Sequence, residues 1–185
     1  MDAPDLERLA ELPRLVAGLM PELTADLEEL VAIPSVSETG FPEHTHAALL
    51  EARDKVIGLF AAAGCSDLDS LELPDTAPIV VGGMPAPPGA PTVLLYSHYD
   101  VVGPGDESEW NTPPFQAVER DGAILGRGAA DTKSNILALV GALRAWEGRP
   151  PVGVKLVIEG QEEVGGGALL GYPEQHPELF AADVM

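Results

Sequence analysis

Residues 92–100 read Thr-Val-Leu-Leu-Tyr-Ser-His-Tyr-Asp, an apolar run that ends in a histidine and an aspartate. The apolar positions do not alternate with polar ones, so the run predicts a central β-strand that is buried on both faces. His98 and Asp100 follow directly after this strand. Because open α/β proteins bind ligands at the carboxyl ends of their strands, we expect the functional site here.

A second strand of the same kind is expected farther along the chain. Residues 152–158 form another non-alternating apolar run, in which Lys155 is the only charged residue. Between the two runs, residues 132–146 are apolar on most sides, as in a helix that packs against a sheet. This order indicates an α/β fold, a three-layer sandwich around a mostly parallel mixed sheet. Residues 1–20 are expected to form a leader that Pro13 interrupts. The other expected elements are helices at 21–34 and 43–63, strands at 68–73 and 79–81, and a hairpin at 118–125.

The composition limits the partners of the protein. The chain has 185 residues, and its 30 acidic residues against 10 Lys and Arg give a net charge of −20. Such a surface repels nucleic acids and anionic membranes, so neither is expected as a partner. No apolar stretch approaches the ~20 residues that span a membrane, and the amino terminus is acidic where a signal peptide is basic. Cys65 is the sole cysteine and is expected to be a small buried residue. These features favour a cytoplasmic protein of one domain.

Three short clusters contain the residues that could carry chemistry. They lie at 97–100, 128–131 and 159–163, and together they supply one imidazole and several carboxylates. Nitrogen and oxygen ligands of this kind suit zinc, manganese or cobalt. A further carboxylate beside the last ligand would be placed to deprotonate a metal-bound water. The sequence therefore predicts a metal-dependent hydrolase.

Each candidate residue also has an ordinary structural explanation. His98 could be a turn histidine that is hydrogen-bonded to a nearby acid, and Asp131 could be the N-cap of the helix that follows it. Glu162 and Glu163 could lie in a solvated loop. However, this pair is followed by three glycines at 165–167. A flexible backbone next to concentrated negative charge is a setting that a bound cation would stabilise.

The order of the clusters resembles that of one family, the dinuclear-metal hydrolases. This family includes carnosine dipeptidase, aminoacylase, acetylornithine deacetylase, succinyl-diaminopimelate desuccinylase and carboxypeptidase G. The resemblance runs from about Leu23 to the end of the chain. The segments at 110–115 and 126–131 are most similar to the dipeptidase branch. Four ordered motifs carry the likeness, at residues 95–102, 110–115, 121–133 and 159–165.

The resemblance implies a zinc-peptidase-like catalytic domain that holds two divalent ions, zinc above all, with manganese or cobalt as alternatives. His98 would bind the first ion with the support of Asp100, Asp131 would bridge the two ions, and Glu163 would bind the second. Glu162 would be the general base that takes a proton from the bridging water, and the resulting hydroxide would attack an amide carbonyl. The substrates would be dipeptides or N-acyl amino acids, cleaved near a free carboxylate. The peptide bond after Asp131 is expected to be cis.

The sequence departs from the family pattern in three places and in length. Ser134 stands where a glycine is common, Gln161 where a glutamate often lies, and Gly166 where a serine is frequent. Family members are more than twice as long and dimerise through an inserted lid domain. We therefore expect residues 1–185 to be the amino-terminal part of the catalytic domain, without the lid and the carboxyl-terminal part.

That expectation affects the predicted activity. Of five expected metal-ligand positions, a late histidine and one further aspartate are not accounted for. Asp183 is the only candidate for the aspartate, but its place at the start of an expected strand favours a ligand just past Met185. We therefore expect the 185-residue chain to hydrolyse peptides poorly and the full-length form to be a homodimer. Two alternatives stay open: an N-acyl-amino-acid deacylase of the same family, or a non-catalytic truncated remnant.

Overall fold

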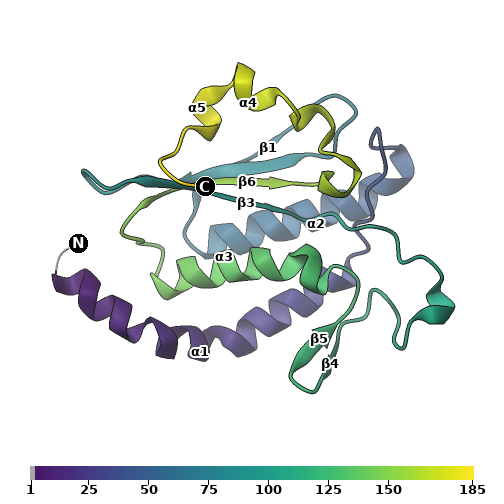
Figure 1. Cartoon of the computed structure of the whole chain (residues 1–185), viewed down its shortest axis with the longest axis horizontal. Helices are drawn as coiled ribbons and strands as arrows, with labels where there is room; N and C mark the ends of the chain where they lie inside the picture. Colours follow the sequence, from purple (N-terminus) through teal and green to yellow (C-terminus); the bar gives the residue numbers. More distant parts are fainter. Residues whose placement is uncertain (1–2) are drawn as a thin grey trace.

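A computed structural model describes residues 3–185 as a mixed sheet with helices on both faces (Figure 1). The sheet contains, in spatial order, β1 (Ser66–Leu71), β2 (Ile79–Met84), β6 (Gly153–Glu159) and β3 (Thr92–His98). A separate hairpin consists of β4 (Val118–Arg120) and β5 (Ala123–Leu125). Asp121 and Gly122 occupy its turn with φ values of 53° and 76°, the left-handed pair that a tight hairpin requires. The predicted α/β class and hairpin are confirmed.

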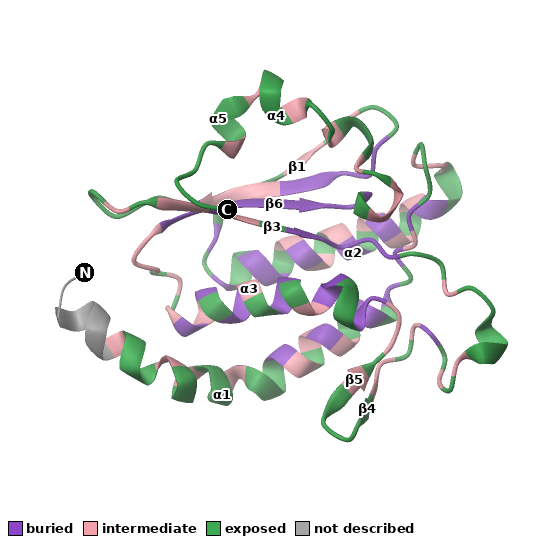
Figure 2. Cartoon of the chain, viewed as in Figure 1, coloured by how far each residue is buried: buried purple, intermediate pink, exposed green. Residues whose placement is uncertain are grey.

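Three helices lie on one side of the sheet and two short ones lie on the other (Figure 1). The first group is α1 (Ala3–Ala32), α2 (Glu43–Ala62) and α3 (Ser134–Ala145), and the second is α4 (Tyr172–Gln175) and α5 (Pro177–Phe180). The larger apolar core lies between the first group and the sheet, and it includes Leu30, Leu49, Phe60, Ile136 and Leu156. A smaller cluster of Ile79, Leu94 and Val157 lies on the other face, against Leu169 and Phe180. Buried residues are accordingly concentrated in the strands and on the inner sides of the helices (Figure 2).

The arrangement of β3 differs from the prediction. Within residues 3–185 it is the last strand of the sheet and not a central one, and only its pairing with β6 is parallel. On its other side, β3 makes only an isolated bridge, in which the amide of Leu94 donates to the carbonyl of Val184 at 2.8 Å. Tyr96 therefore stays 42% exposed in the middle of an otherwise apolar strand. Apolar content predicted the strand correctly, but it does not specify how many neighbours a strand has.

The amino-terminal helix is longer than predicted. α1 runs without a break through Pro13 and Pro21, where the sequence suggested a leader and a new helix. Proline inside a helix costs about 3 kcal/mol. Val16 and Met20 continue the apolar face of Leu23 and Leu27, and the four residues line one groove of about 380 Å³ against α3. Leu23 and Leu27 are buried, whereas Val16 and Met20 stay exposed, so the packing that offsets this cost lies in the second half of the helix. Figure 1 shows the helix bent.

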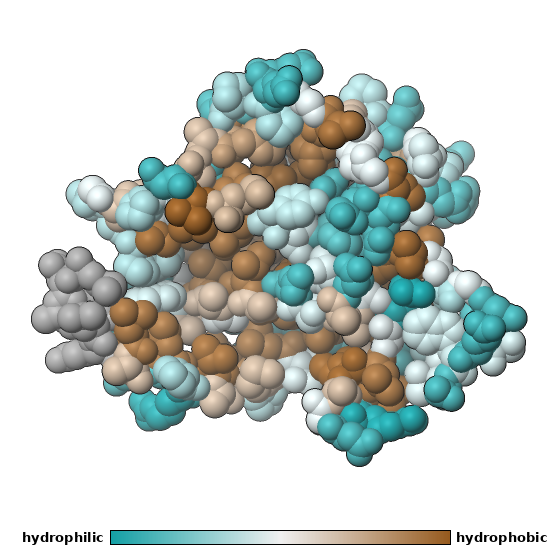
Figure 3. All heavy atoms as spheres, in the orientation of Figure 1, coloured by the Kyte–Doolittle hydropathy of each residue, from teal (hydrophilic) through white to brown (hydrophobic). Residues whose placement is uncertain are grey.

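Apolar side chains gather on the surface near this groove (Figure 3). The groove is lined by α1, α3 and Ile124 of β5, and it includes none of the predicted site residues. Among residues 3–185, no helix is both long and apolar enough to cross a lipid bilayer.

Candidate metal centre

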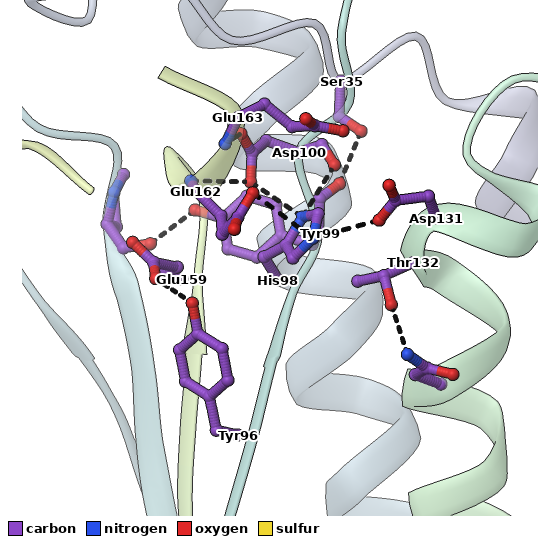
Figure 4. A network of polar contacts seen from close by, with 12 residues as sticks. Ser35, Tyr96, His98, Tyr99, Asp100, Asp131, Thr132, Glu159, Glu162 and Glu163 are labelled. Atoms are coloured by element: carbon purple, nitrogen blue, oxygen red, sulfur yellow. Dashed lines mark hydrogen bonds and ion pairs between the residues drawn. The ribbon is translucent and has the colours of Figure 1, made fainter. Parts of the chain in front are cut away.

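His98 is the last residue of β3 and lies beside the end of β6. The parallel register places it opposite Glu159, the last residue of β6. The clusters at 97–100 and 159–163 therefore meet at the carboxyl ends of two paired strands, as the sequence predicted (Figure 4). The His98 side chain is itself buried.

Asp100 holds the histidine and the glutamate pair together. Its Oδ1 lies 3.3 Å from Nδ1 of His98. The same carboxylate accepts the backbone N–H of Glu162 at 3.2 Å and of Glu163 at 3.1 Å. Asp100 is fully buried, so these polar contacts are shielded from water. The sequence predicted only the contact with His98, since the other two join residues more than 60 positions apart.

The second ring nitrogen of His98 faces two further carboxylates (Figure 4). Its Nε2 lies 3.5 Å from Oδ1 of Asp131 and 3.8 Å from Oε2 of Glu162. Burial lowers the pKa of His98, but the hydrogen bond and the negative charge of Asp100, together with Glu162, outweigh burial and raise this pKa to about 9. The ring is therefore held by one acid and directed at two others.

Asp131 lies in an irregular turn, Ala129–Lys133, that leads into α3. Gly128 precedes the turn with a φ of 79°, and Asp131 itself has non-helical angles. Its side chain is 79% exposed and makes no N-cap hydrogen bond with α3. The ordinary explanation of Asp131 as an N-cap is therefore wrong. The peptide bond between Asp131 and Thr132 is cis, as predicted.

Glu162 and Glu163 begin a single 3-10 turn, Glu162–Val164, directly after β6. Burial raises the pKa of Glu163, and the nearby charge of Asp131 raises it further, so negative charges crowd this edge of the sheet. Glu162 lies within ion-pair distance of His98, whereas no ion pair joins Glu163 to the ring. Within residues 3–185, no three His, Cys, Asp or Glu side chains are grouped closely enough to hold a metal ion.

The donors at this edge nevertheless fit a divalent cation chemically. They are one imidazole nitrogen and three carboxylates, the set that zinc and manganese accept. Since Nδ1 of His98 is occupied by Asp100, the ring presents Nε2 to the acids. His98, Asp131 and Glu163 are the side chains that could hold ions, and Glu162 is the remaining carboxylate at this edge.

Lys133 fixes the segment that carries Asp131 to the end of α1, a role that the sequence did not reveal. Its Nζ donates to the carbonyl oxygens of Leu30 and Ile33, each at 2.8 Å, where α1 ends. Burial lowers the pKa of Lys133 to about 7, against the opposing effect of Asp100. The only available signal was its position two residues after Asp131 in a chain with few lysines.

The comparisons with known proteins identify the family of this chain. Residues 94–182 match the model of Peptidase family M20/M25/M40, and this segment contains all five predicted site residues. A cysteinylglycine-S-conjugate dipeptidase of Corynebacterium striatum is 39% identical over 86% of this chain and 35% of its own length. A Beta-Ala-His dipeptidase of Rattus norvegicus is 36% identical over 88% of this chain and 35% of its own. The chain therefore belongs to this family of peptidases.

The fold agrees as well. The crystal structure of human carnosine dipeptidase 1 superposes with a TM-score of 0.84 and 28% identity, over 93% of this chain and 38% of that one. The described sheet and helices are therefore those of a peptidase catalytic domain. The chain spans about a third of the length of the curated relatives it matches, 35% of each.

Proposed function

We propose that this chain carries the catalytic centre of a metal-dependent hydrolase that cleaves the amide bond of dipeptides. One observation supports this proposal above the others: His98 is fixed through Nδ1 by Asp100 and directs Nε2 at Asp131 and Glu162. A turn histidine that is merely hydrogen-bonded would need one acid and not three. The names of the dipeptidases among the relatives favour peptides as substrates.

The side chains divide into ion-binding and proton-transferring groups. His98, Asp131 and Glu163 would hold two divalent ions, zinc above all, and these ions would supply Lewis-acid activation of the water and the carbonyl. Glu162 would not bind an ion, and its Oε2 lies 3.8 Å from Nε2 of His98. It would take a proton from the attacking water at Oε2 and return it to the nitrogen that leaves. Asp100 would hold His98 and the Glu162 turn in their relative positions, because it contacts both.

Two finer parts of the proposal concern the chain as a whole. The 185-residue chain is expected to hydrolyse peptides weakly by itself, which the lack of a three-ligand group among the described residues supports. The complete protein is expected to be a cytoplasmic homodimer. The domain assignment proposed for residues 1–185 is the amino-terminal part of a catalytic domain.

Titration of the purified chain with Mn²⁺ or Zn²⁺, followed by calorimetry, tests the proposal. Wild type and Glu162→Gln should bind the ion weakly, because no three-ligand group lies among the described residues, whereas His98→Ala and Asp131→Asn should bind it at least about tenfold more weakly still. His44→Ala is the matched control, because His44 lies on the surface beside Glu38. Binding that survives the loss of His98 would contradict the proposal.

Turnover then separates the enzyme from a remnant. Hydrolysis of a dipeptide by the chain, however slow, should need the ion and should disappear in Glu162→Gln. Glu174→Gln is the control, since Glu174 is an exposed glutamate of α4. Equal rates in the presence and absence of a chelator would contradict a metal-dependent hydrolase.

A further inference from the structure

A second pocket adjoins the candidate metal centre on the side away from Asp131. It has a volume of about 340 Å³ and lies between the ends of β3 and β6 and the segment that leads to α4. Its polar lining comes from Tyr96, Glu159 and Glu162, and no lysine or arginine lines it. Leu169, Leu170 and Pro173 form its apolar wall. The pocket therefore combines negative charge with an apolar side, next to the proposed general base.

Glu159 is the unusual residue of this pocket. Its side chain is 95% buried, as its relative exposure of 5% shows. Oε1 accepts a hydrogen bond from the hydroxyl of Tyr96 (Figure 4). Oε2 is buried and has no hydrogen-bond partner, and none of the ion pairs among the described residues includes Glu159. A buried carboxylate oxygen without a donor is costly, so its position calls for a ligand that donates to it.

Gly166 is the pocket residue that lies next to this buried oxygen. The glycine lines the same pocket, and a Cβ atom built on it would lie 3.4 Å from Oε2 of Glu159. Any side chain at this position would therefore occupy the space next to the oxygen. The φ of Gly166 is +73°, a conformation that also favours glycine.

We propose that this pocket binds the free amino terminus of a dipeptide, with Oε2 of Glu159 as the acceptor for its ammonium group. An ammonium group brings both the donors and the positive charge that the pocket lacks. The apolar wall then receives the side chain of the first residue. The inference rests on the proposed function and deepens it, because it distinguishes dipeptides from N-acyl amino acids, whose nitrogen is neutral.

Binding measurements test this assignment without turnover. The ¹⁵N-labelled chain is titrated with glycylglycine and with N-acetylglycylglycine, with no metal present, and the amide signals of Gly165 and Gly166 are followed. We expect glycylglycine to shift these signals and to bind about tenfold more tightly than the acetylated peptide. Glu159→Gln should abolish the difference, whereas Glu174→Gln, the same change on the exposed face of α4, should retain it.

Two substitutions at Gly166 test the same inference if Glu159→Gln fails to fold. Gly166→Ser and Gly166→Ala impose the same backbone strain, but only the serine brings a donor to Oε2. The serine variant should lose the preference for the free amine, and the alanine variant should retain more of it. Equal binding of the two peptides by wild type, or binding of neither, would overturn the inference.

Failure of this inference can be distinguished from failure of the proposed function. A chain that prefers the free amine but hydrolyses nothing with any metal supports the pocket and contradicts the hydrolase. A chain that hydrolyses both peptides equally supports the hydrolase and overturns the pocket.

Discussion

Nζ of Lys133 lies 2.8 Å from the carbonyl oxygen of Leu30, more than 100 residues earlier in the chain. A second bond of the same length joins it to Ile33. The last carbonyls of a helix have no partner within the helix, and a cation there also interacts favourably with the helix dipole. The segment that carries Asp131 is thus fixed to the end of α1 by a fully buried side chain.

Substitution of this lysine should destabilise the fold. Lys133→Met keeps the approximate length of the side chain but removes two buried hydrogen bonds, so the carbonyl oxygens of Leu30 and Ile33 keep only their backbone donors, the N–H groups of Ile33 and Ser35. We expect the free energy of unfolding to fall by about 2 kcal/mol, measured by urea denaturation. Lys155→Met is the control: Lys155 donates one bond to the carbonyl of Glu178 and is more exposed, so its loss should cost about 0.5 kcal/mol or less. Equal losses would contradict this role of Lys133.

Asp100→Asn should weaken the metal centre without touching a proposed ligand. The amide group replaces one acceptor oxygen with a donor, so it cannot serve His98 and both N–H groups of the glutamate turn. We expect the affinity for Mn²⁺ to fall about tenfold or more by calorimetry. Asp106→Asn, which alters an exposed aspartate that also accepts a backbone N–H, at 2.9 Å from Ser108, should leave the affinity unchanged. An unaltered affinity in Asp100→Asn would show that its contacts are dispensable.

Gly160 separates β6 from the glutamate pair and admits no side chain. A Cβ atom there would overlap the ring and hydroxyl of Tyr99, which is buried and donates at 2.5 Å to the carbonyl of Pro78. Gly160→Ala should therefore destabilise the protein by about 3 kcal/mol or prevent folding. Gly58→Ala, on an open surface of α2, should instead stabilise it by about 0.5 kcal/mol, since alanine favours helix. Circular dichroism during thermal unfolding measures both, and a neutral Gly160→Ala would disprove the steric argument.

The free energy of unfolding should depend on pH through Cys65, which lies away from the candidate site. Burial raises the pKa of its thiol from 9.0 to about 11. Between these values the unfolded chain loses the thiol proton while the folded chain keeps it. The contribution to stability is therefore complete below pH 9 and is lost as the pH rises towards 11. The free energy of unfolding should fall more steeply over this window in wild type than in Cys65→Ala.

The same burial predicts slow chemistry at Cys65. Alkylation by iodoacetamide at pH 8.5 should be much slower in the folded chain than in urea, because thiolate is the reactive form. Rapid alkylation of the folded chain would show that the thiol is accessible.

The pattern of neighbouring residues correctly predicted those elements that depend only on neighbouring residues. The apolar runs of β3 and β6, the helix between them and the Asp121–Gly122 turn all follow from nearby residues. The place of β3 at the end of the sheet does not, because strand order depends on pairing between distant segments. The unbroken α1 is likewise decided by its packing, which outweighs Pro13 and Pro21.

The candidate site divides in the same way. The motifs located His98, Asp131 and Glu162, and the structure brings all three to one edge of the sheet. They could not show that Asp100 holds both glutamate amides, or that Glu159 pairs with Tyr96 across two strands. Such bonds depend on the register between β3 and β6, which no short stretch of sequence encodes.

The parallel pairing of β3 with β6 has a consequence for folding kinetics. His98 meets Glu159 only after the intervening 60 residues, including α3, have crossed over from one strand to the other. Closing so long a loop before its contacts form is slow relative to helix or hairpin formation. Partly folded chains can therefore contain α1, α2 and the β4–β5 hairpin before the candidate metal centre is assembled. In refolding experiments, the capacity to bind Mn²⁺ should return later than the helical signal.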